Sequence, residues 1–346
     1  MGEREFRSRI YWLTFAFSVL VIWVHAVNAE LFLGPGAGEG WVGRTEQFLG
    51  SGLGQFAVPG FFILSAYLFF RGFSMAQLKR KWKSRVRSLL IPYLLWNGLY
   101  YAGYAAATRI PLAASVVGKP PVPVNLPEFL DALFFYAYNP VFWYLFQLIL
   151  LTALAPALYF VMKDARSGGT GLVLLGFFLS TNRNFPVLNG DALFYYGMGA
   201  FASLHGRKWI EEAGRPGRGC AKIICLAALA GLSWLLGRPG FPLYRSALSL
   251  ILFRAFGAGT AAMAALLLPL PPAAEFMKNN FFLYAMHFAW VRLINKSAAL
   301  VLPHEPFFAL GTFIAMPAAI TALCTLFAGL GRRFCPQAYS LFSGSR

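Results

Sequence analysis

The sequence is poor in charged residues, and this shortage excludes an ordinary soluble protein. Only 12% of its 346 residues are charged, whereas 58% are hydrophobic. A typical soluble domain carries about twice this share of charge. A large soluble domain with an apolar core would also need amphipathic surface helices, which the sequence lacks. The composition therefore indicates an all-α integral membrane protein that crosses the bilayer several times.

Cysteines are also few, and they form no recognisable cluster. The four cysteines are Cys220, Cys225, Cys324 and Cys335, and none belongs to a CxxC pair or to a metal-binding spacing. We expect free thiols that fill apolar space. A Gly-rich nucleotide loop and a Ser-His-Asp arrangement are missing too. The sequence therefore predicts neither a metal site nor a permanently bound cofactor.

Acidic residues number 13 against 30 basic ones, which gives a net charge of +17. Such a charge can indicate nucleic-acid binding, but here the basic residues occur in short runs between apolar stretches. This distribution is typical of membrane proteins, whose cytoplasmic loops are rich in Lys and Arg. We therefore expect a membrane-lipid environment, most simply the inner (plasma) membrane, and no nucleic-acid partner.

Ten apolar stretches predict ten spans in a single domain, 1–346, with both termini in the cytoplasm. Long loops are expected outside the cell at Gly34 to Gly54, which is Gly-rich, and at 109–139, which is Pro-rich and is expected to be a loop rather than a helix. The two short spans, the fifth and sixth, could instead be re-entrant. The predicted spans are 10–32, 54–73, 88–107, 140–162, 169–181, 191–205, 221–236, 246–268, a stretch beginning near Asn280, and 307–330.

The first apolar stretch, IYWLTFAFSVLVIWVHAVNAELF, contains one histidine, His25. In a continuous helix Thr14, Ser18, His25 and Asn28 would lie within about 80° of one another. The stretch would then carry one polar stripe, which we interpret as a wall of a reaction chamber. Val27-Asn28-Ala29 would also suit a signal-peptidase site, but the run is long for a signal peptide, which favours a retained span.

His25 has two possible roles. Ionisable side chains at this depth are rare and usually functional, so the functional hypothesis is a general base that removes a proton from a hydroxyl group. The alternative is a histidine that hydrogen-bonds a neighbouring helix and contributes only to packing. Arg254 also lies within a predicted span, and either Asp191 or Glu30 could pair with it.

Several short motifs make the chain resemble acyltransferase family 3, the integral-membrane acyltransferases that modify sugars and other surface molecules. Ala66 replaces a glycine of the second motif, and Asn280 replaces a serine of the fifth. In chain order, the motifs are His25 in the first span, FFILSAYLFF, KRKWKSRVRSLLIPYLLW, Phe142-Trp143-Tyr144-Leu145 and NNFFLYAMHF.

The resemblance implies an O-acyltransferase, most simply an O-acetyltransferase. It would use cytoplasmic acyl-CoA as a co-substrate and a hydroxyl of a cell-surface glycan or lipid-linked sugar as the acceptor. Arg85 and Arg87 would bind the coenzyme phosphates, because guanidinium groups bind phosphate through two hydrogen bonds. The alternative is that the basic residues of this loop only set the orientation of the protein in the membrane. Trp143, Tyr284 and His287 would line the substrate site, although a belt tryptophan or a packing histidine is also consistent with their positions.

One position departs from the family pattern. The family usually has an arginine eleven residues before the histidine of the first span, and this chain has Thr14 there. Either another basic residue, such as Arg85 or Arg87, performs the role of the missing arginine, or the activity of this chain differs from that of the family. A transporter or flippase for an anionic solute or glycolipid, with Arg254, Arg292 and Lys296 along its path, is the second hypothesis. A scaffold subunit with a degenerate site is the third.

Overall fold

The computed structural model describes residues 2–212, 218–244 and 246–344, and within these ranges the chain is helical without any β-strand. The helices form two compact units. Unit 1 comprises Met1–Val21, Gly52–Lys81 and Leu150–Lys278, and unit 2 comprises Ile22–Ser51, Trp82–Ile149 and Asn279–Arg346. The division between the units falls inside α1 (Glu3–Ala26), η2 (Gln47–Gly52), α5 (Leu78–Arg85) and α9 (Trp143–Ala153).

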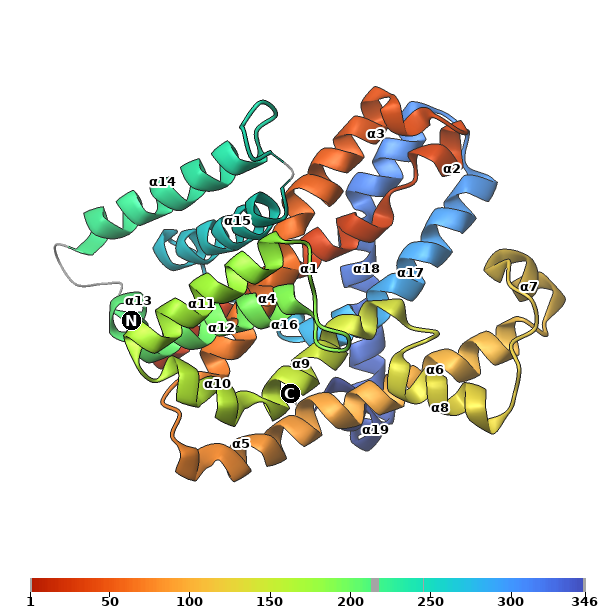
Figure 1. Cartoon of the computed structure of the whole chain (residues 1–346). Helices are drawn as coiled ribbons and strands as arrows, with labels where there is room; N and C mark the ends of the chain where they lie inside the picture. Colours follow the sequence, from red (N-terminus) through yellow and green to blue (C-terminus); the bar gives the residue numbers. More distant parts are fainter. Residues whose placement is uncertain (1, 213–217, 245, 345–346) are drawn as a thin grey trace. The chain divides into compact units, whose positions relative to one another are not determined.

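Unit 1 is built around closely packed helices with small residues at their contacts. Gly199 of α12 lies against α4, where a Cβ would overlap the carbonyl group of Ile63. Figure 1 shows α14 and α15 side by side, and the Ser233 hydroxyl of α14 donates to the Phe253 carbonyl of α15. The whole helices of this unit are η3 (Leu53–Phe56), α4 (Ala57–Phe70), η4 (Met75–Gln77), α10 (Ala155–Met162), α11 (Ala165–Ser180), α12 (Gly190–His205), α13 (Arg207–Glu211), α14 (Arg218–Gly237), α15 (Ala247–Leu267) and α16 (Glu275–Lys278).

Unit 2 contains the last part of α1 together with the long helices α17 and α18. Side chains of α6 form hydrogen bonds with backbone carbonyl groups of other helices in this unit. The Tyr93 hydroxyl donates to the Phe134 carbonyl at 2.7 Å, and the Trp96 indole donates to the Phe342 carbonyl at 2.9 Å. The whole helices of this unit are α2 (Ala29–Leu33), η1 (Ala37–Glu39), α3 (Trp41–Glu46), η5 (Val86–Leu90), α6 (Ile91–Ala107), α7 (Pro111–Val117), α8 (Leu126–Phe135), η6 (Pro140–Phe142), α17 (Asn280–Val301), α18 (Pro306–Phe334) and α19 (Pro336–Ser343).

The chain is a multi-pass membrane protein, and its described residues include five helical stretches long and apolar enough to cross a bilayer. A sixth is possible if Leu126–Phe135 and Pro140–Ala153, which meet at a bend of 49°, form one span. The five stretches are Glu3–Leu33, Trp41–Phe70, Gly219–Gly237, Ala247–Leu267 and Pro306–Phe334.

Each of the ten predicted spans coincides with helical structure, but several of these helices are short. Helix α6 has 17 residues, and α11 and α12 have 16 each. A helix needs about 20 residues to cross the hydrocarbon core. The ten spans and the cytoplasmic position of both termini therefore stay predictions.

The prediction of a loop at 109–139 is wrong, because this segment contains α7 and α8. Its prolines begin helices instead of preventing them: Pro111 and Pro127 lie in the first turns of α7 and α8. A first-turn N–H has no helical partner, so proline is tolerated there. The Asn125 side chain caps α8 by accepting a hydrogen bond from the Glu128 N–H at 2.9 Å.

The predicted Gly-rich loop from Gly34 to Gly54 is also largely helical. It contains η1, α3 and η2, and α3 starts the stretch Trp41–Phe70 that is long enough to span a bilayer. Gly34 and Gly36 adopt positive φ values of 89° and 85°, so the turn itself is confined to the start of the segment. Glycine favours such backbone angles because it has no Cβ.

Candidate functional site

His25 lies in the last turn of α1 and is half-buried in unit 2. The helix ends one residue later, at Ala26, and the carbonyl group of Ala26 accepts a hydrogen bond from the Asn295 side chain at 3.0 Å. Asn295, on α17, is itself buried and accepts a hydrogen bond from the Asn28 side chain at 3.3 Å. The end of α1 is thereby fixed to α17, which carries His287.

Asn28 does not continue the helical face of His25, and this corrects the predicted stripe. The backbone at Asn28 leaves the helical conformation, with φ −144° and ψ 1°, and α2 begins at Ala29. A carboxylate stabilises the break: Glu46, which is fully buried, accepts hydrogen bonds from the backbone N–H groups of Asn28 and Ala29 at 3.0 and 3.1 Å.

Glu46→Ala is expected to lower the free energy of unfolding by about 2–4 kcal/mol, because two buried N–H groups lose their acceptor. Glu46→Gln retains one acceptor oxygen and should cost less. Unfolding in detergent, followed by circular dichroism, measures the change. Gln47→Ala, at the exposed neighbouring position, is the control. A Glu46→Ala protein as stable as the control would show that the carboxylate does not hold this break.

The two histidines of unit 2 lie next to each other. The ring centroids of His25 and His287 are 5.4 Å apart, and the His25 ring also meets the edge of Phe288 at 5.4 Å. His287 is fully buried on α17. Sequence positions 25 and 287 are thus brought together, as a shared site requires.

Hydrogen bonding defines the tautomer of His287. Its Nδ1 lies 2.6 Å from the backbone carbonyl oxygen of Tyr284, so Nδ1 must carry the proton and donate it. The neutral ring then has an unprotonated Nε2 with a free lone pair. This Nε2 is buried and has no hydrogen-bond partner among the described residues. A buried acceptor of this kind is available to a donor group of His25 or of a bound substrate.

Tyr284 connects α17 with the start of α9. Its hydroxyl donates to the Val141 carbonyl at 2.7 Å, and its ring stacks on Phe142 at 5.4 Å with an interplanar angle of 8°. The Tyr144 ring meets Tyr284 edge-on at 5.8 Å. Trp143 is the first residue of α9 and is half-buried. In the sequence it stands between Phe142 and Tyr144, the two residues whose rings contact Tyr284. The two motifs around Trp143 and His287 therefore form one aromatic cluster.

Thr14 and Ser18 belong to unit 1, whereas His25 and Asn28 belong to unit 2. The Thr14 hydroxyl donates within its own helix, 2.9 Å from the Ile10 carbonyl and 3.1 Å from the Tyr11 carbonyl. Ser18 is buried, with 4% of its surface exposed. Their role in lining a substrate path stays a prediction.

Arg85 and Arg87 lie where α5 passes into the π-helical turn η5 that leads to α6. Arg85 is half-buried, and Arg87 is exposed. Both belong to unit 2, the unit that contains His25 and His287. Phosphate binding by these two guanidinium groups stays a prediction.

Arg254 pairs with Asp191, which answers a question that the sequence left open. Its guanidinium group lies 3.4 Å from an Asp191 carboxylate oxygen and donates to the Gln55 side-chain oxygen at 2.8 Å. All three residues belong to unit 1, whereas Arg292 and Lys296 belong to unit 2. The three cations of the transporter hypothesis therefore do not gather within one unit.

Sequence reasoning missed Glu46 and Asn295, which together hold the end of α1. Asn295 follows His287 by eight residues, a spacing that places both on one face of α17. This spacing was the available signal for Asn295. No comparable signal marks Glu46, because its two hydrogen-bond partners are backbone groups of another segment.

Comparisons with known proteins identify the family of the chain. A family model described as an acyltransferase domain, that of acyltransferase family 3, matches residues 12–328. The chain is also similar to the succinoglycan biosynthesis protein ExoH of Rhizobium meliloti (strain 1021). The two are 25% identical over 322 residues, which cover 89% of this chain and 84% of that protein. No solved structure is significantly similar. The chain belongs to acyltransferase family 3 and is a membrane enzyme that transfers acyl groups other than aminoacyl groups.

Proposed function

We propose that this protein transfers an acyl group, most simply acetyl, from cytoplasmic acyl-CoA to a hydroxyl of a surface polysaccharide or of its lipid-linked precursor in the inner membrane. Family membership supports acyl transfer, and the name of the similar Rhizobium meliloti protein, which refers to succinoglycan biosynthesis, supports a polysaccharide acceptor. The observation that carries the proposal is the adjacent pair of His25 and His287.

In the proposed reaction His25 accepts the proton of the acceptor hydroxyl as the oxygen attacks the thioester carbonyl carbon. The C–O bond forms and the C–S bond breaks, so coenzyme A leaves as a thiolate. The proton held on His25 then passes to the thiolate sulfur. The product is an ester, the released coenzyme carries a thiol, and the histidine returns to its neutral state.

His287 acts in this proposal as a positioning residue for His25. The two imidazole rings are neighbours, and the His287 Nε2 has no hydrogen-bond partner among the described residues, so in the proposal this nitrogen accepts a hydrogen bond from an N–H of His25 during the reaction. A hydrogen bond to a charged group contributes about 1.5–3 kcal/mol. The bond would therefore favour the protonated form of His25 that exists during the reaction.

Trp143, Tyr284 and His287 would form the substrate-facing wall beside His25, and Arg85 with Arg87 would bind the phosphates of the coenzyme. The stacked rings of Tyr284 and Phe142 make this wall rigid. A rigid wall suits catalysis because the reacting groups must be held in one orientation. The transporter hypothesis is less well supported, because Arg254 already has Asp191 and Gln55 as partners.

Mass spectrometry of surface polysaccharide tests the proposed acceptor. Cells that lack this protein are expected to lose O-acyl groups from one polysaccharide. Wild-type protein should restore the groups, whereas His25→Ala, produced at the same level in the membrane, should not. Identical acylation of every surface glycan with and without the protein would contradict a polysaccharide acceptor.

A further inference from the structure

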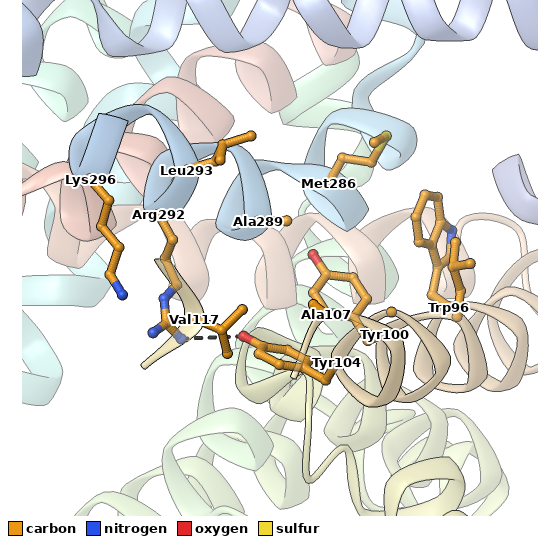
Figure 2. Close-up of a pocket in the computed structure, with 12 residues that line it drawn as sticks. Trp96, Tyr100, Tyr104, Ala107, Val117, Met286, Ala289, Arg292, Leu293 and Lys296 are labelled. Atoms are coloured by element: carbon orange, nitrogen blue, oxygen red, sulfur yellow. Dashed lines mark hydrogen bonds between the residues drawn. The ribbon is translucent and has the colours of Figure 1, made fainter. Parts of the chain in front are cut away.

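A concave site lies on unit 2, between α6, α17 and Val117 at the end of α7. The cavity has a volume of about 360 Å³, within the range of small-molecule pockets. Figure 2 shows side chains of α6 and α17 facing each other across it. Its lining consists of Trp96, Leu99, Tyr100, Gly103, Tyr104, Ala107, Val117, Met286, Ala289, Arg292, Leu293 and Lys296.

This cavity uses a different set of α17 residues from the histidine site. Met286, Ala289 and Leu293 line it at intervals of three and four residues, the spacing of one helical face. His287 instead contacts the His25 ring. The Tyr100 hydroxyl is already used, because it donates to the Ala285 carbonyl at 3.0 Å. The middle of the cavity therefore offers mainly apolar contacts.

One end of the cavity is cationic. Figure 2 shows Arg292 and Lys296 together at this end and Trp96 with Met286 at the other. Arg292 donates to the Tyr104 hydroxyl at 3.3 Å and lies over the Phe288 ring, and no carboxylate pairs with it in the described part of the chain. Lys119 adds a third positive charge, 5.1 Å from the Tyr104 ring centroid.

A bound anion would be favourable at this end of the cavity, where two cationic side chains lie close together. Arg292 and Lys296 are four residues apart on α17, a spacing at which like charges repel on a helix surface. The planar guanidinium group binds phosphate through two parallel hydrogen bonds, and a lysine ammonium contributes a compact point charge. An apolar cavity with such an end is complementary to a molecule with a hydrocarbon chain and a phosphate group.

We propose that this cavity binds a membrane lipid with a net negative phosphate headgroup, one whose phosphate carries no attached cationic group. The phosphate lies at Arg292 and Lys296, and the hydrocarbon chain runs past Gly103 and Ala289 toward Trp96 and Met286. In the predicted topology the cationic end faces the outer side of the membrane, where a lipid headgroup would lie. Lipid binding is independent of the acyl transfer proposed above and can be measured without it.

A larger side chain at Gly103, which lines the cavity, can test whether the shape of the cavity contributes to lipid binding. A Cβ at Gly103 would meet no atom within 4 Å, so a larger side chain can enter the cavity without displacing backbone. Gly103→Leu should therefore fill part of the tail path. Gly311 of α18 has the same open surroundings but does not line the cavity, so Gly311→Leu is the matched control.

The test uses the purified full chain in detergent and measures binding by calorimetry. The probes are lysophosphatidic acid, lysophosphatidylcholine with the same acyl chain, glycerol 3-phosphate and palmitoyl-CoA. Lysophosphatidic acid is expected to bind saturably and at least tenfold more tightly than lysophosphatidylcholine. Glycerol 3-phosphate, which has no tail, should not bind measurably.

The variants separate the contribution of the charges from that of the shape. Arg292→Gln combined with Lys296→Gln should remove the preference for lysophosphatidic acid, whereas Arg44→Gln, at an exposed cation outside the cavity, should retain it. Gly103→Leu should weaken binding of both lipids at least fivefold, and Gly311→Leu should leave it unchanged.

Three results would overturn the proposal. One is equal affinity for the two lysolipids, and another is an unchanged preference in the double variant. The third is palmitoyl-CoA binding that is tighter than lysophosphatidic acid binding and lost in the double variant. That outcome would assign the cavity to the acyl donor instead of a membrane lipid.

Discussion

Replacing His25 with alanine is expected to lower kcat for acyl transfer by about 10²–10⁴-fold, the usual contribution of a positioned general base. The loss arises because the alanine side chain has no group that can accept the hydroxyl proton. The KM for acyl-CoA should change little, since the imidazole acts on the acceptor hydroxyl. Initial rates of transfer from labelled acetyl-CoA, measured on the purified variant, give both constants.

His304→Ala is the matched control for this variant. His304 is exposed in the short segment between α17 and α18, and its Nε2 lies 2.8 Å from the Ala299 carbonyl oxygen. Its replacement should leave kcat within about twofold of wild type. A folded His25→Ala protein that retains the wild-type kcat would remove His25 from the reaction.

Combining Arg85→Ala with Arg87→Ala is expected to raise the KM for acyl-CoA by roughly 10- to 100-fold, with little change in kcat. Each lost hydrogen bond to a charged phosphate costs about 1.5–3 kcal/mol, and part of this cost is screened at a solvent-exposed site. Titration of the donor at a saturating acceptor concentration measures the effect.

The comparison variant combines Lys79→Ala with Lys83→Ala. It removes two positive charges from α5 as well, and both lysines are exposed. If basic residues here serve only to orient the protein in the membrane, the two double variants should behave alike. A donor KM that rises equally in both, or in neither, would remove Arg85 and Arg87 from a specific phosphate site.

Much of the helical framework could be predicted, because a long apolar run that crosses a membrane must satisfy its backbone hydrogen bonds internally and therefore forms a helix. The stretch near Asn280 predicts α17, and 246–268 predicts α15 within one residue at each end. The family resemblance also selected Trp143 and His287, whose segments meet through Tyr284.

The details that define the site could not be predicted from apolar periodicity. The end of α1 at Ala26 depends on Asn295 and Glu46, which lie in other segments, and an apolar run carries no information about such partners. The helices within 109–139 were missed because proline interrupts a helix interior but is favourable in a first turn. The sequence alone does not distinguish the two positions until a helix start is known.

The central claim is that the purified protein itself transfers an acyl group from acyl-CoA to a hydroxyl of a glycan. In the most direct measurement, the protein in lipid nanodiscs is given a lipid-linked oligosaccharide and acetyl-CoA that is labelled both in its acetyl group and in its coenzyme part. The account predicts that acetyl label appears as an alkali-labile ester on the glycan while free coenzyme A accumulates in equal amount. A folded protein that releases no coenzyme A and leaves the glycan unlabelled would contradict it.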